Sequence, residues 1–341
     1  MHPPTPLKFL APGWFSLVMG LCGLALAWQA ATPVLGERAT GAALVLGGVA
    51  LLVFVALAAA SLLRWQRHTQ ALEEDLKHPV RHAFVATVPV SLLLLATLGQ
   101  ALGLEHWGVR GLWWAGSLLQ LWATVWVMGR WLAPGVSAGG ANPNAASLWP
   151  TITPVLFIAV VGNVVAPLAG VALGHGVWAA AQWGIGVLFW PVVLTLLLVR
   201  RFAHSPLPDR LLPTWLITVA PPAVIGLGVL QFQAPAWVAQ ALWGVALFCL
   251  LWVGTQVTRM VAQPFGIAFW AWSFPLAAFT ALTLRLATLH QAAGLQMAGV
   301  LLLAITSLVV VGLVLATVRG LRNGSLLAPE PVAQITVASS P

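Results

Sequence analysis

Residues 39–63 read ATGAALVLGGVALLVFVALAAASLL, a run of twenty-five positions that contains no charged side chain. A run of about 20 apolar residues is long enough to cross the hydrocarbon core of a bilayer as one α-helix. The run is also continuous, whereas the strands of membrane barrels are shorter and alternate between apolar and polar residues. This stretch therefore predicts a membrane-spanning helix.

The composition of all 341 residues agrees with that prediction: 60% are hydrophobic, 6% are charged and 19 are Trp. A soluble domain usually carries about 25% charged residues, so 15 Lys+Arg and 7 Asp+Glu are too few to cover a water-facing surface. Disorder is excluded as well, because disordered chains combine high charge with low hydrophobicity. At about 30 residues for each span plus its loop, the length allows about ten or eleven helices of roughly 20 residues each.

Ten apolar runs are long enough to span the membrane, at residues 9–31, 39–63, 83–102, 111–132, 151–173, 177–199, 212–232, 235–257, 265–288 and 295–318. Several links between them are very short, which forces neighbouring helices to be antiparallel. We therefore expect an all-α polytopic membrane protein made of five helical hairpins. Residues 1–8 are expected to be a cytoplasmic N-terminal segment, 9–319 the ten-span pore domain, and 320–341 a flexible cytoplasmic tail.

The basic residues predict the orientation in the membrane. Ten spans put both termini on one side, and with the N-terminus in the cytoplasm 12 of the 15 Lys and Arg residues are cytoplasmic: Lys8, Arg64, Arg67, Lys77, Arg81, Arg130, Arg200, Arg201, Arg210, Arg259, Arg319 and Arg322. The positive-inside rule therefore predicts a multi-pass protein of the cell inner (plasma) membrane with both termini cytoplasmic. Because topology accounts for the net charge of +8, no nucleic-acid partner is expected.

Acidic residues and histidines are missing from the interior of the predicted spans. All seven acidic residues and all eight histidines fall in loops, tails or span ends. Intramembrane carboxylates and histidines are the usual parts of proton relays and cation sites, so cation-coupled transport and acid-ringed cation channels are disfavoured. The two cysteines, Cys22 and Cys249, lie inside apolar runs, which disfavours a disulfide or a metal site.

Catalytic chemistry is also missing. The sequence contains no Ser/His/Asp arrangement and no His-Glu-x-x-His motif. We expect no enzyme activity, no cofactor and no metal. Passage of anions or neutral solutes then remains by elimination, since an uncharged pathway does not repel anions and a basic cytoplasmic rim raises their local concentration.

Proline distinguishes the odd-numbered spans from the even-numbered ones. Among the even spans only the sixth has a proline inside, Pro191, whereas every odd span contains one or more, among them Pro12, Pro89, Pro154, Pro167, Pro221, Pro222 and Pro275. Proline removes a backbone hydrogen bond and kinks a helix, and in a membrane the freed carbonyls need protein or water partners. The pattern favours five kinked inner helices around a central pore. Proline is also frequent in membrane helices generally, which leaves the alternative that its placement carries no function.

His78-Pro79-Val80-Arg81 precedes the third span. It resembles the HPVR motif of the tellurite-resistance/dicarboxylate transporter family, the TehA-like proteins, whose superfamily includes the plant slow-type guard-cell anion channels. Three further stretches resemble that superfamily in the same order: Val161-Gly162-Asn163-Val164-Val165, Ala220-Pro221-Pro222 and Trp270-Ala271-Trp272-Ser273-Phe274-Pro275. The first span, from Pro12 to Gly20, is similar to the malate and sulfite permease branches, and the match runs from about residue 9 to 319.

The resemblance implies a homotrimer in which each protomer has its own pore, occluded near mid-membrane by one phenylalanine. By motif match this gate is Phe274. We expect the pore to be lined by residues of the inner helices: Pro89, Asn163, Pro221, Pro222, Ser273 and Pro275. Asn163 and Ser273 could donate hydrogen bonds to a passing anion or could instead bond between helices. His78 and Arg81 match the family motif at the cytoplasmic entrance, where they could attract anions or anchor the helix.

The resemblance implies an anion channel or channel-like uniporter that passes small inorganic or organic anions across the lipid bilayer. The alternative is a secondary transporter for dicarboxylates, sulfite or tellurite. A third hypothesis, an exporter built from two inverted five-span repeats, predicts a similarity between residues 1–170 and 171–341 that the sequence does not show. No residue distinguishes tellurite from chloride, nitrate, malate or sulfite.

Overall fold

The computed structural model describes residues 6–104, 107–132, 136–137 and 146–328, so the outer parts of the predicted terminal segments, 1–5 and 329–341, lie outside the described residues. Its α-helices are α1 (Ser16–Ala30), α2 (Thr32–Leu35), α3 (Glu37–Arg67), α4 (Thr69–Lys77), α5 (Thr87–Ala101), α6 (Trp107–Gly129), α7 (Leu156–Ala159), α8 (Pro167–Gly170), α9 (Gly176–Ala203), α10 (Ala220–Gln231), α11 (Ala236–Gly254), α12 (Val257–Val261), α13 (Ser273–His290) and α14 (Ala293–Arg322).

The 3₁₀ helices are η1 (Pro6–Phe9), η2 (Pro12–Phe15), η3 (Arg81–Ala86), η4 (Arg130–Leu132), η5 (Trp149–Thr151), η6 (Val161–Val165), η7 (Asp209–Val219) and η8 (Ile267–Trp272). Two strands of two residues each, β1 (Val136–Ser137) and β2 (Ala146–Ser147), form a parallel pair. Apart from this short pair, the predicted all-helical architecture is confirmed.

Among the residues that the structure describes, eight continuous helical stretches are long and apolar enough to cross a membrane: Pro12–Ala30, Glu37–Arg67, Arg81–Ala101, Gly176–Ala203, Asp209–Gln231, Ala236–Gly254, Ile267–His290 and Ala293–Arg322. The two other predicted spans differ for identifiable reasons. α6 is 23 residues long, but its five Trp and its polar residues make it less apolar than the eight. The fifth predicted span is not one helix, because α7, η6 and α8 follow one another as three short pieces.

The long stretches alternate between an inner and an outer position. In the apolar parts of the stretches that begin at residues 12, 81, 209 and 267, 72–83% of the residues are buried within the protein. In those that begin at 37, 176, 236 and 293, only 22–28% are buried. Every residue from 152 to 170 is buried as well. The proline-rich odd-numbered segments are therefore the inner ones.

Four of the inner segments change from 3₁₀ to α-helix, and in three of these prolines lie in the first turn of the α-helix. η2 leads into α1, η3 into α5, η7 into α10 and η8 into α13. Pro89, Pro221, Pro222 and Pro275 occupy the second or third position of the α-helix that follows. The first-turn N–H groups of an α-helix lack an intrahelical partner, so a proline is tolerated there. The outer helices α3 and α14 instead run without interruption for 31 and 30 residues.

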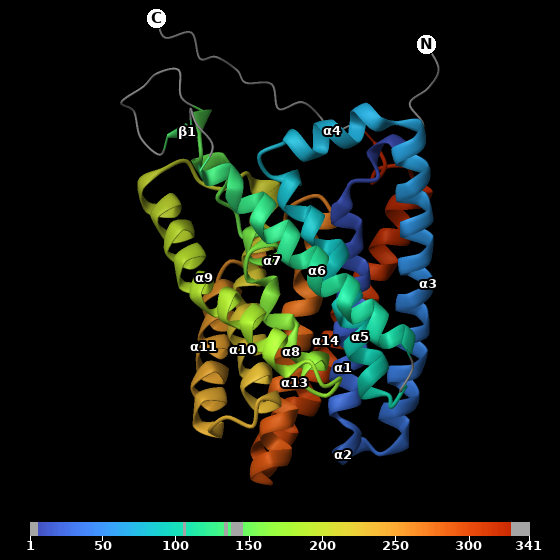
Figure 1. The fold of residues 1–341 in the computed structure, drawn as a ribbon, viewed down its shortest axis with the longest axis vertical. Coiled ribbons are helices and arrows are strands. Elements are labelled where there is room, and N and C mark those ends of the chain that lie inside the picture. The colour runs from blue at the N-terminus through green and yellow to red at the C-terminus, as the bar shows by residue number, and fades with distance from the viewer. Residues whose placement is uncertain (1–5, 105–106, 133–135, 138–145, 329–341) are drawn as a thin grey trace, which may run out of the picture.

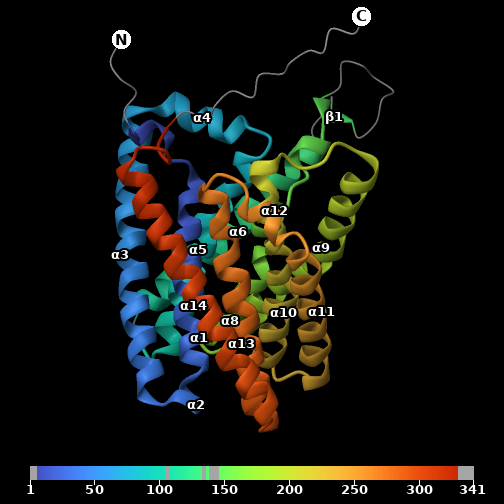
Figure 2. The ribbon, with the colours of Figure 1, turned by 180° about the vertical axis from the view of Figure 1, so that it is seen from behind.

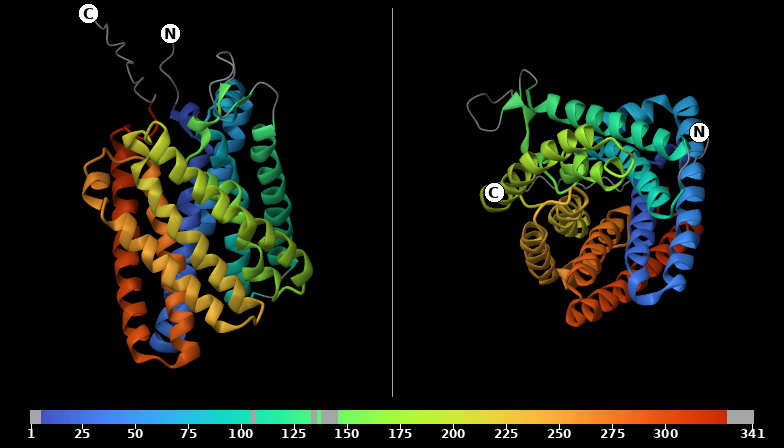
Figure 3. Two further views of the ribbon diagram at one scale, coloured as in Figure 1. Left: turned by 90° about the vertical axis from the view of Figure 1, so that its left-hand side faces the viewer. Right: turned by 60° about the horizontal axis from the view of Figure 1, so that its bottom comes forward.

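Helix α4 and the pair β1–β2 lie at one end of the molecule and α2 lies at the other (Figure 1). The last turns of α14 reach the α4 end, as the opposite view shows (Figure 2). Seen from the side and from the α2 end, the long outer helices such as α3, α6 and α14 enclose the inner segments (Figure 3). α14 continues to Arg322, so the first three residues of the predicted tail, 320–322, are helical.

Candidate functional site

The inner segments enclose a central cavity of about 60 Å³. All five contribute to its wall, with Ser16 and Met19 from α1, Val90 from α5, Phe157, Ile158, Val161, Gly162, Val164 and Val165 from the broken fifth segment, Ile217, Ala220, Pro221 and Val224 from η7 and α10, and Trp270, Ala271, Phe274 and Pro275 from η8 and α13. A water needs about 10–15 Å³ of such space, so the cavity has room for a small group. The described lining residues include no acidic side chain.

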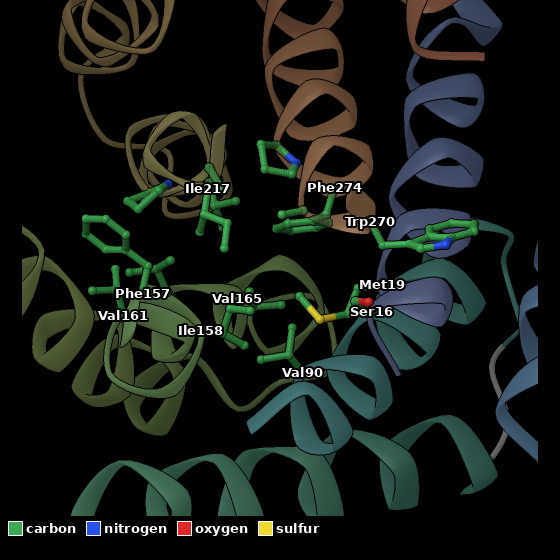
Figure 4. A pocket seen from close by; sticks show the side chains of 17 residues that line it. Ser16, Met19, Val90, Phe157, Ile158, Val161, Val165, Ile217, Trp270 and Phe274 are labelled. Atoms are coloured by element: carbon green, nitrogen blue, oxygen red, sulfur yellow. The ribbon is translucent and has the colours of Figure 1, made fainter. Parts of the chain in front are cut away.

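Phe274, the predicted gate, lies at this cavity. Its side chain projects from the start of α13 into the space between Ile217 and Trp270 (Figure 4). On the other side the ring rests against Gly23 of α1, because a Cβ added there would lie 3.0 Å from Phe274 Cδ2. Because Gly23 has no side chain, the Phe274 ring can pack directly against α1. Whether Phe274 gates a pore stays a prediction.

Two of the predicted pore-lining prolines, Pro221 and Pro275, also line the cavity. Pro89 and Pro222 are buried in the first turns of α5 and α10, outside the residues that line it. Ser273 is fully buried, and its hydroxyl donates to the carbonyl of Trp270 (2.6 Å). Pro89, Pro222 and Ser273 therefore support the wall in this conformation.

Asn163 lies in η6 and is fully buried, but its amide is directed towards the outer helices. Nδ2 donates to Thr124 Oγ1 (2.7 Å) and to the carbonyl of Val160 (3.0 Å), and Oδ1 accepts from Gln182 Nε2 (3.3 Å). Asn163 was expected either to donate to a passing anion or to bond between helices. In the structure its amide bonds to other segments.

His78 and Arg81 are brought together where the chain enters η3. His78 Nδ1 accepts hydrogen bonds from the backbone N–H groups of Val80 (3.1 Å) and Arg81 (3.2 Å). These are N–H groups at a helix start, which a side-chain acceptor satisfies as a cap does. The carbonyl of His78 is 3.0 Å from Nδ1 of His82. Both ends of the motif are thus engaged in local contacts that fix the beginning of the third segment.

A buried ion cluster holds α4 against this point. Asp75 is 1% exposed, and its two oxygens pair with Arg64 Nη2 (2.6 Å) and Arg81 Nη1 (2.8 Å). Arg64, at the end of α3, also donates to the carbonyls of Lys8 and Ala71. The cluster joins four stretches of chain, and Arg81 takes part through a side chain that is still 34% exposed.

Most residues of the cavity wall were not predicted from the sequence. Met19, Val90, Phe157 and Ile217 line it, but an apolar side chain that faces a cavity has the same composition signal as one that faces lipid. A second feature, which no family motif marks, is a set of buried polar residues on α6 and α9. Its signal was present, because Trp113, Ser117, Gln120 and Thr124 recur at helical spacing on one face of α6.

The fold and the site define a polytopic membrane protein with an apolar, proline-walled central cavity. Residues 10–318 match the voltage-dependent anion channel family, SLAC1. The chain belongs to this family, and the resemblance deduced from its motifs is confirmed.

Three relatives show the range of the family. The S-type anion channel SLAH2 of Arabidopsis thaliana is 22% identical over 280 residues, which cover 80% of this chain and 51% of the plant protein. A sulfite efflux pump SSU1 of Arthroderma otae is 25% identical, with 81% of each chain covered. A tellurite resistance protein TehA homolog of Haemophilus influenzae is 24% identical, with 80% of this chain and 79% of the relative covered. Anion transport across a membrane is the function these relatives support.

Proposed function

We propose that the chain is an anion channel or channel-like uniporter whose pathway runs through the central cavity and is closed there by Phe274. One observation carries the proposal: five proline-containing segments converge on a single cavity, and Phe274 stands in its wall. An aromatic ring in a narrow apolar space acts as a hydrophobic constriction that excludes water and therefore ions. Opening then needs only a movement of the ring or of the wall that faces it.

Charge supports anions as the solute. No described residue of the cavity wall is acidic, and the hydroxyl of Ser16 is already donated to the carbonyl of Gly13 (2.7 Å). At the α4 end, Arg81 keeps a partly exposed guanidinium beside the third segment. Basic side chains at an entrance raise the local concentration of anions and their rate of arrival. No catalytic step is part of this proposal, and it needs no cofactor.

The proposed arrangement in the membrane has ten spans, with α6 and the broken fifth segment as the fourth and fifth. The α4 end is cytoplasmic, as the positive-inside rule requires, and so are both termini. Residues 9–319 then form the pore domain in the inner (plasma) membrane. The assembly proposed is a homotrimer with one pore in each protomer, and the large apolar side chains exposed on α3, α6, α9, α11 and α14 are available to lipid and to neighbouring protomers.

The alternative function is secondary transport of a dicarboxylate, sulfite or tellurite. Two relatives are named as a sulfite efflux pump and as a tellurite resistance protein homolog, and these names favour retaining this alternative. It predicts saturable uptake that follows a pH gradient. Among the described residues, no acidic side chain lies at the cavity to carry the coupled proton, so the substrate would have to carry that proton itself.

The test is anion flux in proteoliposomes at controlled membrane potential and buffered pH, with chloride, nitrate and malate gradients. Phe274→Ala is compared with wild type and with Phe248→Ala, a matched control on α11 whose side chain is 63% exposed at the outer surface. A channel predicts that electrogenic chloride or nitrate flux rises well above wild type in Phe274→Ala only. Background anion flux in Phe274→Ala, together with wild-type malate uptake that follows the pH gradient, would establish the alternative.

A further inference from the structure

The broken fifth segment is the largest contributor to the cavity wall, and it is not held by its own backbone bonds alone. Three pieces of four, five and four residues, α7, η6 and α8, replace what would otherwise be one helix. In a membrane-spanning protein the carbonyls freed at such breaks must find protein partners, because lipid supplies none. Side chains elsewhere in the protein must therefore donate hydrogen bonds to these carbonyls.

Helix α6 supplies those partners from a polar stripe of four side chains. Gln120 Nε2 donates to the carbonyls of Ile158 and Ala159, both at 3.1 Å. Thr124 Oγ1 lies 2.8 Å from the carbonyl of Ala159. At the other end of the stripe, Trp113 Nε1 donates to the carbonyl of Ala166 (2.9 Å), which also accepts from the backbone N–H of Gly170 (3.0 Å). These bonds fall on the two breaks, α7–η6 and η6–α8.

Helix α9 completes the arrangement from the other side. Ser117 Oγ donates to Gln182 Oε1 (2.7 Å), and Gln182 Nε2 donates to the carbonyl of Ser117 (2.8 Å) and to Asn163 Oδ1 (3.3 Å). Asn163 in turn donates to Thr124 Oγ1. Ser117, Gln120, Asn163 and Gln182 are each at most 1% exposed. Outer helices α6 and α9 and the cavity wall are thus joined by one buried hydrogen-bond network.

Gln120 stands directly behind the wall. Gly162 lines the cavity, and a Cβ added to it would lie 2.8 Å from Gln120 Nε2. The amide therefore occupies the place that a side chain on Gly162 would need. Both of its N–H groups are already donated to backbone carbonyls, so Gln120 has none left for an anion. Gln120 can therefore act on a passing solute only through the position of the cavity wall.

We propose that Gln120 is a positioning residue: its amide bonds hold the fifth segment in its broken form and thereby set the width of the pathway opposite Phe274. The proposal rests on the proposed function. Helices α6 and α9 face outward. Under this proposal, a change outside the protomer reaches the cavity wall through these two helices.

The test measures conductance and the nitrate-to-chloride permeability ratio in the open background Phe274→Ala. Gln120→Leu keeps the approximate volume of the side chain and removes both donated bonds. The carbonyl of Ala159 keeps its contact with Thr124, so only that of Ile158 loses its side-chain partner. We therefore expect the conductance or the permeability ratio to change by about fivefold, the shift in wall population that the loss of one net hydrogen bond produces. Gln240→Leu is the matched control, because Gln240 is an exposed glutamine of α11 that bonds His290.

Thr124→Val repeats the test with a near-isosteric residue if Gln120→Leu does not fold, and the same direction of change is expected. A folded Gln120→Leu protein with unaltered conductance and permeability ratio overturns the proposal. Hydrogen exchange over residues 156–165 separates the two ideas. If Phe274→Ala itself carries no anion current, the proposed function fails; faster exchange confined to 156–165 in Gln120→Leu then still supports the positioning role, and unchanged exchange refutes it.

Discussion

Replacement of Asp75 by Asn tests how strongly α4 is held against the C-terminal end of α3. The carboxylate is 2% exposed and pairs with Arg64, which is 5% exposed, at 2.6 Å and with Arg81 at 2.8 Å. Removing one partner of a buried ion pair costs about 3–5 kcal/mol, because the other charge stays buried without compensation. Arg64 keeps two bonds to backbone carbonyls, and the Arg81 pair is screened through its 34% exposure, so we take the lower figure, ~3 kcal/mol.

That energy acts on a local equilibrium, the detachment of α4 from the bundle. A cost of about 3 kcal/mol raises the detached population about 100-fold. Trypsin cleaves after Arg67, the last residue of α3, and after Lys77, the last residue of α4, and its rate follows the open population when opening is fast. We therefore expect cleavage at these positions to accelerate about 100-fold in Asp75→Asn.

The control is Glu73→Gln in the same helix. Glu73 pairs with Lys77 at 3.4 Å, and their side chains are 59% and 78% exposed, so its removal should change the cleavage rate less than about threefold. Equal rates in Asp75→Asn and Glu73→Gln would refute the reasoning that burial gives this pair its weight.

Three further predictions concern packing around the inner segments. Gly186→Leu should prevent folding or weaken the bundle severely, because a Cβ there already lies 2.9 Å from a backbone oxygen of η6; normal yield and melting temperature would contradict this. Arg200→Met should lower the melting temperature by several degrees, since it removes a 2.7 Å bond to the carbonyl of Ile152, and Arg201→Met, an exposed neighbour, should not. Thr317→Val leaves the Nε1 of buried Trp270 without its 2.9 Å partner and should cost about 1–3 kcal/mol; an unchanged unfolding midpoint would exclude that cost.

Much of the fold was predictable because its signals are local. The continuous run 39–63 is contained in one helix, α3, and the prolines mark the inner segments. The apolar run alone could not show that residues 151–173 form three pieces. An apolar sequence with two prolines and two glycines is compatible with a kinked helix or with a broken segment. The choice depends on donors that lie far along the chain, at Gln120 and Trp113.

The candidate site was predictable only where a family motif marked it. Phe274 and Pro275 were found in this way, and both line the cavity. Asn163 was correctly placed on an inner segment, but its direction was not predictable, because at a break in a helix the face of a residue does not follow from helical periodicity. Its amide faces α6 and α9 because Thr124 and Gln182 provide the buried polar partners there.

The sequence by itself determined that this chain is an all-helical membrane protein, which segments contain proline, and which family it belongs to, because apolar length, composition and short motifs are properties of contiguous residues. Only the tertiary structure decided that five inner segments share one cavity, that Gly23 seats Phe274, and that a polar stripe on α6 holds the cavity wall. These features depend on which side chains meet across distant segments. In an apolar interior a buried polar group must be paired, so the donors on one helix decide the backbone conformation of another.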